Sequence, residues 1–310
     1  MLANPGIAGV LSLFALCLWM HFRPRTEIAP RLFLLTIAVL LFGPLSEWVM
    51  EAESQGTPLK FDYFLYLIDR GLGLSAFVVA RLFNDWQRTA LYCVYQSLVF
   101  VMFAQYWLHL YVDRSRAARL LTSYGITFFT GPIVYLIVPG RGPRHAFGAM
   151  FPFGTPDVQP ALVQLSGWPN AIPSLHVSTA LLFVMLVANR KWLRAFAWLY
   201  LVGTVGATLA FEHYVIDLVV AVPFACFATL AAKGQLRWAA ANFGMVLGWL
   251  VAIRFFTPYL LISPFLLKLL ACGTIVAAVW TLLRKAPSES TVRGTFTRMW
   301  TARPAVSAQP

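Results

Sequence analysis

The chain has 310 residues, of which 59% are hydrophobic and 12% are charged, and its mean hydropathy is +0.70. Soluble domains are about 45–50% apolar and about 25% charged, so this composition excludes a soluble enzyme, a disordered chain and a nucleic-acid-binding domain. The net charge of +12 comes from 24 Lys and Arg against 12 Asp and Glu. In a membrane protein, the distribution of this charge among the loops is more informative than its sum.

Nine apolar segments approach the length of about 20 residues that a helix needs to cross a bilayer. The sequence therefore predicts an all-α polytopic membrane protein with about nine transmembrane helices. We expect these spans at 6–22, 32–50, 89–110, 117–138, 173–189, 192–211, 213–232, 239–257 and 261–283. No positive residue leads into the first span and no small-residue cleavage site follows it, so we expect a mature helix and not a secretory signal.

The spans divide the chain into five parts. We expect N-terminal transmembrane helices at 1–50, an outer loop with an interfacial helix at 51–88, a membrane core at 89–235, C-terminal transmembrane helices at 236–284 and a disordered cytoplasmic tail at 285–310. The tail is polar, and a segment of that composition cannot bury a core of its own.

The basic residues orient the bundle. Sixteen of the 24 Lys and Arg fall in alternate loops and in the tail, and the positive-inside rule places these segments in the cytoplasm. The alternation predicts an N-terminus outside and a C-terminus inside, and it agrees with nine spans. Residues 51–88 and 139–172 then form two long outer segments.

The first outer segment contains an aromatic stretch, from Phe61 to Arg70, with charges towards both ends. This pattern favours an amphipathic helix in the membrane interface. A re-entrant or tenth spanning segment is the alternative, but it would break the alternation of charged loops.

Each of the four cysteines lies inside an apolar run, and none belongs to a C-x-x-C pair. We therefore expect buried free thiols, not disulfides or zinc ligands. These residues are Cys17, Cys93, Cys226 and Cys272.

The strongest functional signal is the run E-H-Y-V-I-D at positions 212–217, at the outer start of the seventh span. His213 and Asp217 are four residues apart and therefore share one face of a helix. A carboxylate in this position orients the imidazole and raises the basicity of its other nitrogen, as in an activated nucleophile. The alternative is a structural polar pair that bridges two helices.

A second signal is P-S-L-H at positions 173–176, at the outer start of the fifth span. Proline suits the first turn of a helix, and Ser174 together with the backbone N–H groups of that turn can bind an anion. His176 lies beside this position. The alternative is an N-cap serine followed by an interfacial histidine.

Arg141 and Arg144 lie three residues apart in the Gly- and Pro-rich outer loop that precedes this span. Two such guanidinium groups can hold a phosphate through forked hydrogen bonds, although arginine is also common in loops without a ligand. All three signals are predicted at the outer surface. Together they supply an anion-binding site, one histidine with a carboxylate partner and one without, which indicates phosphoryl transfer through a phosphohistidine.

In this order, the blocks G-P-R, P-S-L-H and H-Y-x-x-D resemble the three motifs of the type-2 phosphatidic acid phosphatase superfamily. The variant is most similar to the branch of inositol phosphorylceramide synthases and, more distantly, sphingomyelin synthases. The superfamily shares its site with vanadium haloperoxidases. The resemblance implies an integral membrane enzyme whose catalytic core is a six-helix bundle within the membrane core, formed by spans three or four to seven and flanking helices.

The resemblance also implies roles for individual residues. His213 would be the nucleophile, Asp217 would orient it, and His176 would be the general acid that protonates the leaving oxygen. His145 is a weaker candidate to line the site, and His109 is expected to be structural. The substrate phosphate would be bound by Arg144, Arg141 and Ser174.

The chain departs from the phosphatase pattern in ways that favour the transferase branch. Leu175 stands where that pattern has glycine, and Gly206 and Ala207 stand where it has a Ser-Arg pair. The lysine of the first motif has no evident counterpart either. Three outer cations are available to replace the missing ones: Lys60, Arg70 and Arg81.

The sequence thus predicts a lipid phosphotransferase similar to inositol phosphorylceramide synthase. A lipid phosphate phosphohydrolase is the alternative within the family, and a non-enzymatic lipid transporter is the alternative from another class. We expect a phospholipid or lipid phosphate and the bilayer as partners, no nucleic acid, and, without a matching motif, no metal or other cofactor. The expected location is a bacterial inner membrane with the site facing the periplasm, or the Golgi lumen in a eukaryote.

Overall fold

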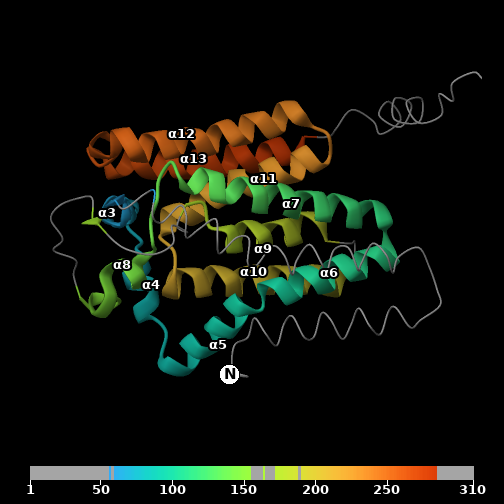
Figure 1. Ribbon diagram of the computed structural model, residues 1–310, viewed down its shortest axis with the longest axis horizontal. Helices are drawn as coiled ribbons and strands as arrows, with labels where there is room; N and C mark the ends of the chain where they lie inside the picture. Colours follow the sequence, from blue (N-terminus) through green and yellow to red (C-terminus); the bar gives the residue numbers. More distant parts are fainter. Residues whose placement is uncertain (1–55, 57–58, 155–162, 165–171, 188–189, 285–310) are drawn as a thin grey trace, which may run out of the picture.

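The structure is a computed structural model, and two of the predicted spans and the predicted tail lie outside the residues that it describes. It describes the following residues (Figure 1): 56, 59–154, 163–164, 172–187 and 190–284.

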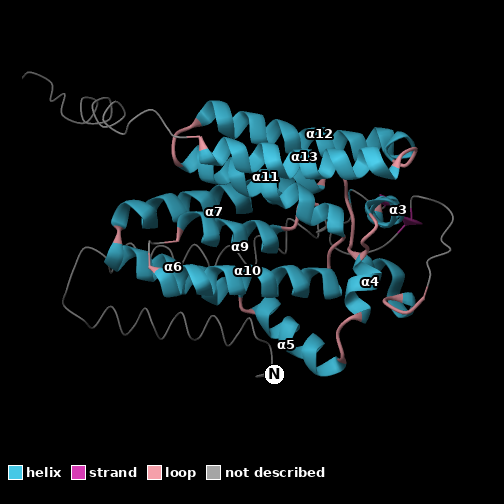
Figure 2. Ribbon diagram, turned by 180° about the vertical axis from the view of Figure 1, so that it is seen from behind, coloured by secondary structure: helices cyan, strands magenta, loops and turns pink. Residues whose placement is uncertain are grey.

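The described chain is helical apart from one antiparallel pair of two-residue strands (Figure 2). The strands are β1 (Leu59–Lys60) and β2 (Val163–Gln164). The shorter helices are α3 (Asp62–Leu72), α4 (Ala76–Arg81), α5 (Asp85–Gln96), α8 (Pro143–Phe147), the 3₁₀ helix η1 (Gly148–Met150) and α9 (Leu175–Leu186). The longer helices are α6 (Leu98–Val112), α7 (Arg114–Tyr135), α10 (Lys191–Phe211), α11 (Val215–Ala232), α12 (Leu236–Leu260) and α13 (Pro264–Leu283).

Four of the described helices are long and apolar enough to cross a membrane, namely α10, α11, α12 and α13. Helices α5 and α6 meet this criterion only together, and they are bent by 48° relative to each other. Helix α9 is apolar but has only 12 residues. These lengths support a membrane protein, but they do not confirm the predicted nine spans or the six-helix core.

The predicted span at 89–110 is broken into two helices. Helix α5 begins at Asp85, within the predicted outer loop, because Asn84 opens it with a capping box. The helix ends before Ser97, whose hydroxyl donates to the Val94 carbonyl and so competes with the helical hydrogen bond. One apolar run therefore forms α5 and α6.

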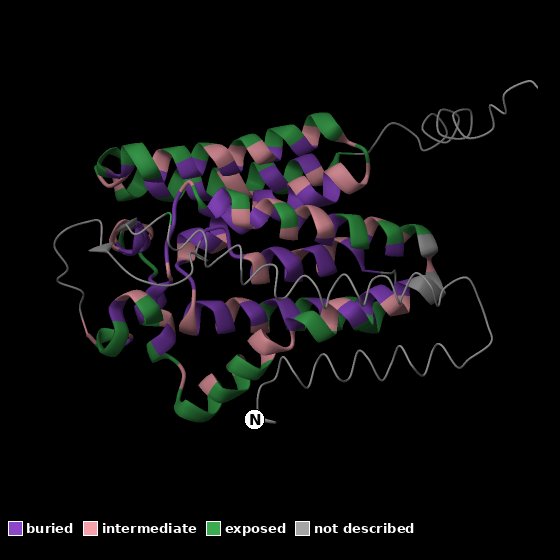
Figure 3. Cartoon of the chain, in the orientation of Figure 1, coloured by how far each residue is buried: buried purple, intermediate pink, exposed green. Residues whose placement is uncertain are grey.

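Helix α11 lies at the centre of the bundle. It packs against α7, α9, α12 and α13, while α10 packs against α4, α5 and α9. Figure 3 shows buried residues along α9, α10 and α11, whereas α5, α12 and α13 have exposed outer faces. These outer faces are rich in large apolar side chains, and we expect them to contact lipid.

The long helices alternate in direction, so the bundle has two distinct ends (Figure 1). The starts of α7 and α10 and the end of α11 gather at one end, where the sequence places the basic inner loops. The ends of α7 and α10 and the starts of α9 and α11 gather at the other end, together with α3 and α8. All three sequence motifs therefore fall at the same end of the bundle.

The aromatic stretch from Phe61 to Arg70 is predicted to form an interfacial helix, and α3 covers it from Asp62 to Leu72 with Phe61 as the N-cap. Its place in the membrane interface stays a prediction. Leu65 and Ile68 are fully buried in a core cluster that also holds Trp249 of α12 and Leu267 of α13. Helix α3 is thus packed between the site end of α11 and the C-terminal pair of helices. Its buried face also carries two carboxylates, which the aromatic pattern did not lead us to expect.

The cysteine prediction is wrong in part. Cys226 is buried in α11, but Cys93 and Cys272 are exposed on α5 and α13. All three are free thiols, and Cys17 lies outside the described residues. In an apolar run, a residue can lie on the face of the helix that packs on protein or on the face that we expect to contact lipid. The prediction assumed that every cysteine packs on protein.

Candidate active site

His213 and Asp217 form a buried hydrogen-bonded pair at the start of α11. The His213 Nδ1 atom lies 3.2 Å from the Asp217 Oδ2 atom, and both side chains are almost fully buried. The same oxygen accepts a hydrogen bond of 2.8 Å from the backbone N–H of Tyr214. A carboxylate at Nδ1 holds the proton on that nitrogen and leaves the lone pair on Nε2, as a nucleophilic imidazole requires.

The turn before α11 fixes the backbone of this pair. The N–H groups of Glu212 and His213 both donate to the carbonyl of Thr208, each at 2.9 Å. Asp217 lies in the first turn of α11, where the positive end of the helix dipole favours a negative charge. The helix therefore both places and stabilises the carboxylate.

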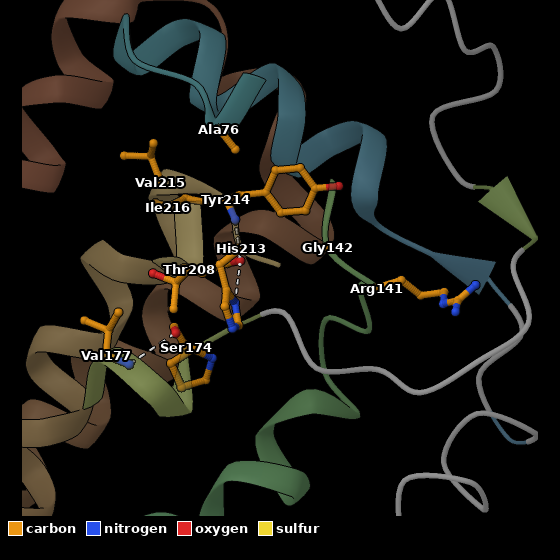
Figure 4. A network of polar contacts seen from close by, with 12 residues as sticks. Ala76, Arg141, Gly142, Ser174, Val177, Thr208, His213, Tyr214, Val215 and Ile216 are labelled. Carbon is orange, nitrogen blue, oxygen red and sulfur yellow. Dashed lines mark hydrogen bonds and ion pairs between the residues drawn. The ribbon is translucent and has the colours of Figure 1, made fainter. Parts of the chain in front are cut away.

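The second motif forms the start of α9, which lies beside the pair of His213 and Asp217 (Figure 4). Ser174 is the N-cap of α9, where its fully buried hydroxyl accepts from the Val177 N–H, and its own N–H donates to the Asp217 carbonyl at 3.2 Å. The His176 ring interacts electrostatically with His213 and stacks on Tyr95, with centroids 3.7 Å apart. The structure thus brings four predicted site residues together.

The two predicted phosphate-binding arginines are placed differently. Arg144 is exposed in α8, with its guanidinium 5.8 Å from the centre of the Phe211 ring, and its positive charge contributes to lowering the pKa of Glu212. It therefore lies beside the residues that precede His213. In Figure 4 the Arg141 side chain points away from His213 and Ser174, so the chain brings Arg144 to the site but turns the Arg141 guanidinium elsewhere.

The three other outer cations also differ in position. Arg81 donates to the carbonyls of Pro152 and Gly154, and Arg70 is exposed in the last turn of α3. Lys60 is fully buried beside Arg141, and burial lowers the pKa of its amine. Lys60 is thus the one of these three that adjoins the first-motif loop.

The sequence profile of the PAP2 superfamily, the type-2 phosphatidic acid phosphatases, matches residues 64–231. The chain belongs to the PAP2 superfamily. No curated protein and no solved structure matched it. The matched residues include all three motifs and α11 up to residue 231, so membership supports an integral membrane phosphatase or phosphotransferase that acts on lipid phosphates.

This PAP2 protein has two site residues on α3 that the sequence interpretation missed. The Asp62 carboxylate accepts hydrogen bonds from the N–H groups of Arg141 and Gly142 and from the Tyr214 hydroxyl. The Asp69 carboxylate accepts from the first N–H groups of α11. The available signal was their spacing, because two acids seven residues apart lie on the same face of a helix.

The PAP2 site also contains a Glu–His pair that the sequence interpretation did not predict. The Glu212 carboxylate lies 3.0 Å from the exposed His145 ring of α8. Burial opposes ionisation of Glu212, but the hydrogen bond to His145 and nearby positive groups outweigh it and lower the pKa of this carboxyl. His145, a weak candidate from sequence, therefore ties α8 to the residue before His213.

Gly142 lets the first-motif loop lie directly on the third motif of this PAP2 chain. Its φ of 85° and ψ of 157° belong to a region that side chains rarely adopt. A Cβ atom at this position would lie 1.9 Å from the Glu212 carbonyl oxygen. Only glycine fits here.

The described ionisable groups do not form a metal centre. In the described part of the chain, no three His, Cys, Asp or Glu side chains gather in a way that could hold a metal ion. His109, expected to be structural, is buried with its Nδ1 atom 2.7 Å from the Gln105 carbonyl oxygen in α6.

Proposed function

We propose that this PAP2 protein is a membrane phosphotransferase that moves a phospho-head group from a lipid to an alcohol acceptor through a phosphohistidine. The proposal depends on one observation above all, the buried hydrogen-bonded pair of His213 and Asp217 next to His176. A nucleophile, an orienting carboxylate and a second titratable group within reach are the requirements of covalent phosphoryl transfer.

The reaction would run in two displacements. In the first, Nε2 of His213 attacks phosphorus, the bond to the leaving alcohol breaks, and His176 gives its proton to the departing oxygen. In the second, an acceptor hydroxyl loses its proton to His176 while its oxygen displaces His213 from phosphorus. Arg144 and Ser174 would bind the phosphate oxygens, since positioning and charge neutralisation dominate phosphoryl transfer.

Two apolar residues at motif positions favour transfer, as in the inositol phosphorylceramide synthases, over hydrolysis. Leu175 stands where the phosphatase pattern has glycine, and it packs so closely on Gly131 that a Cβ added there would lie 2.6 Å from it. Ala207 stands where that pattern has arginine, and it is fully buried. Apolar contacts thus occupy positions that in the phosphatase pattern serve the phosphate.

A phosphohydrolase remains the alternative within the family, in which water is the second acceptor. The alternative from another class is a lipid transporter that uses the same end of the bundle without chemistry. A transporter does not need a His–Asp pair beside a second histidine. By the positive-inside rule the site would face away from the cytoplasm, towards the periplasm of a bacterium or, in a eukaryote, the Golgi lumen.

The deciding experiment offers the purified protein labelled phospholipids, with and without inositol, diacylglycerol or ceramide as acceptors. Transfer predicts a new labelled lipid or alcohol phosphate that depends on the acceptor, whereas hydrolysis predicts release without any acceptor. His213→Ala should abolish turnover but leave folding and lipid binding intact. Turnover or transport that survives this substitution contradicts the mechanism.

A further inference from the structure

Helix α3 carries two buried acids that the mechanism above does not use. Asp62 is 1% exposed and Asp69 is fully buried, and each carboxylate accepts hydrogen bonds from three donors. Among these donors, only two N–H groups come from outside the G-P-R and H-Y-x-x-D motifs: that of Ala76, at 3.4 Å, and that of Arg141, which directly precedes G-P-R. The two acids are therefore directed at the site.

Asp62 links the first motif to the third. Its carboxylate accepts from the N–H of Arg141 at 3.0 Å, from the N–H of Gly142 at 2.9 Å and from the hydroxyl of Tyr214 at 2.8 Å. The backbone N–H of Tyr214 in turn donates to Asp217. One carboxylate thus fixes the loop that leads to the phosphate-binding arginine relative to the orienting carboxylate of the nucleophile.

Asp69 fixes the start of α11. Its two oxygens accept from the N–H of Val215 at 2.9 Å and from the N–H of Ile216 at 3.1 Å. The first N–H groups of a helix have no partner within the helix, and a carboxylate is a strong cap for them. Because Asp217 follows one residue later, this cap determines where the partner of His213 lies.

Burying two carboxylates is energetically unfavourable, so it is a costly way to hold α3 against the rest of the bundle. Burial raises the pKa of Asp62 to about 6, although the Arg141 N–H, the Tyr214 hydroxyl and the Gly142 N–H favour the charged form. Burial also raises the pKa of Asp69. Apolar side chains of similar volume are often at least as stabilising as buried charges. Stability alone therefore does not explain why both acids are directed at the motifs.

We propose that Asp62 and Asp69 are positioning residues for the transfer reaction: Asp62 sets the first-motif loop for phosphate binding, and Asp69 sets Asp217 for the activation of His213. The inference rests on the proposed function. It predicts different kinetic effects for the two acids, since one acts on substrate binding as well as turnover and the other acts mainly on turnover.

The test compares Asp62→Asn and Asp69→Asn with Asp113→Asn in the full-length protein. Asp113 is a matched control because its carboxylate also caps a helix, accepting from the Ser115 and Arg116 N–H groups at the opposite end of the bundle. The measurements are kcat, KM, the vanadate inhibition constant and the thermal midpoint.

We expect Asp62→Asn to lower kcat/KM about 100-fold, as for a misplacement of about 1 Å, with KM and the vanadate inhibition constant both raised. Asp69→Asn should lower kcat at least tenfold with KM within about twofold. Asp113→Asn should lower only the thermal midpoint. If both site variants keep kcat and KM within about twofold of wild type while the midpoint falls, the acids are structural and the inference is wrong.

Two further experiments keep the inference testable if the aspartate variants fold poorly or if the protein does not catalyse the proposed transfer. Tyr214→Phe removes only one of the hydrogen bonds to Asp62 and should lower kcat/KM about tenfold; unchanged kinetics would contradict the link. Hydrogen exchange needs no substrate, so it separates the two proposals if wild type shows no turnover. Asp62→Asn should speed exchange in 141–147 and Asp69→Asn in 213–218, and unchanged exchange in both segments would overturn the inference.

Discussion

Gly142→Ala is the sharpest single test of how the first motif is held. The new methyl group would lie 1.9 Å from the Glu212 carbonyl oxygen, and this neighbour is backbone, so no side-chain rotation can relieve the contact. The φ of 85° and ψ of 157° add a conformational penalty of about 1–3 kcal/mol for a residue with a side chain. The loop must therefore move away from the third motif.

The size of that movement follows from the contact. Real Cβ contacts essentially never fall below 3.0 Å, so the loop or the Glu212 backbone must shift by about 1.1 Å. A misplacement of about 1 Å at a reacting group costs about 100-fold in rate. We therefore expect kcat/KM to fall about 100-fold, because the shift carries Arg144 away from the phosphate and disturbs the residue before His213.

The assay is phospho-head-group transfer by the purified variant, with Gly234→Ala as the matched control. Gly234 also has a positive φ, of 72°, but a Cβ there would meet open space in the turn between α11 and α12. This control should lose about 1–2 kcal/mol of stability from the backbone strain and keep its activity. Folded Gly142→Ala protein with more than about a third of wild-type kcat/KM refutes the reasoning, as does an equal loss in the control.

Three further predictions concern the same end of the bundle. Asp217→Asn should lower kcat at least about 100-fold with KM little changed, because an amide no longer holds the Nδ1 proton of His213 in place; steady-state kinetics decide this. Asp62 has a pKa of about 6 in the folded chain against an ordinary 3.8, so the folded state binds more protons between about pH 4 and 6. The free energy of unfolding should then fall as pH rises through that range, by at most about 3 kcal/mol. The measurement is the thermal midpoint at a series of pH values. If the midpoint of Asp62→Asn depends on pH as strongly as that of wild type, this prediction is wrong. Tyr95→Ala should lower kcat about five- to tenfold through the lost stacking on His176, worth about 1 kcal/mol, whereas Tyr95→Phe should behave as wild type; equal losses in both would point to the hydroxyl.

Local chemistry could be predicted from the sequence. His213 and Asp217 are four residues apart, which predicts that they pair, and the structure confirms the contact. The prediction that both lie on one helical face is wrong in detail, because α11 begins at Val215 and His213 lies in the turn before it. Ser174 caps α9 as its position before an apolar run indicated. In both cases the atoms that meet are close in sequence and lie at the start of one helix, so local geometry brings them together.

Long-range contacts could not be predicted in the same way. The partners of Asp62 lie 79, 80 and 152 residues further along the chain, and the α11 partners of Asp69 lie 146 and 147 residues further. Their spacing puts both acids on one face of α3, but nothing local tells which element packs on that face. The Arg141 side chain raised the same difficulty, since its direction depends on the fold around the loop.

Hydropathy did not indicate the bend inside one apolar segment. Residues 89–110 predict a single span, and α5 and α6 meet the length and hydropathy criterion only together, with a bend of 48° near Ser97. A window average smooths over one polar residue, whereas the backbone responds to that residue directly. Cys93 and Cys272 illustrate the related limit that an apolar residue can face outward on a helix of a membrane protein.

The C-terminal helices α12 and α13 lie beyond the residues that match the PAP2 profile, yet α3 packs against both of them. Leu267 of α13 belongs to the same core cluster as Leu65 and Ile68, which lie between the two acids of α3. The profile match therefore ends before two helices that hold α3 in place. A version of the chain cut after α11 would keep every motif residue and lose the surface that presses α3 onto them, so an engineer who wants a minimal enzyme should retain this helical pair.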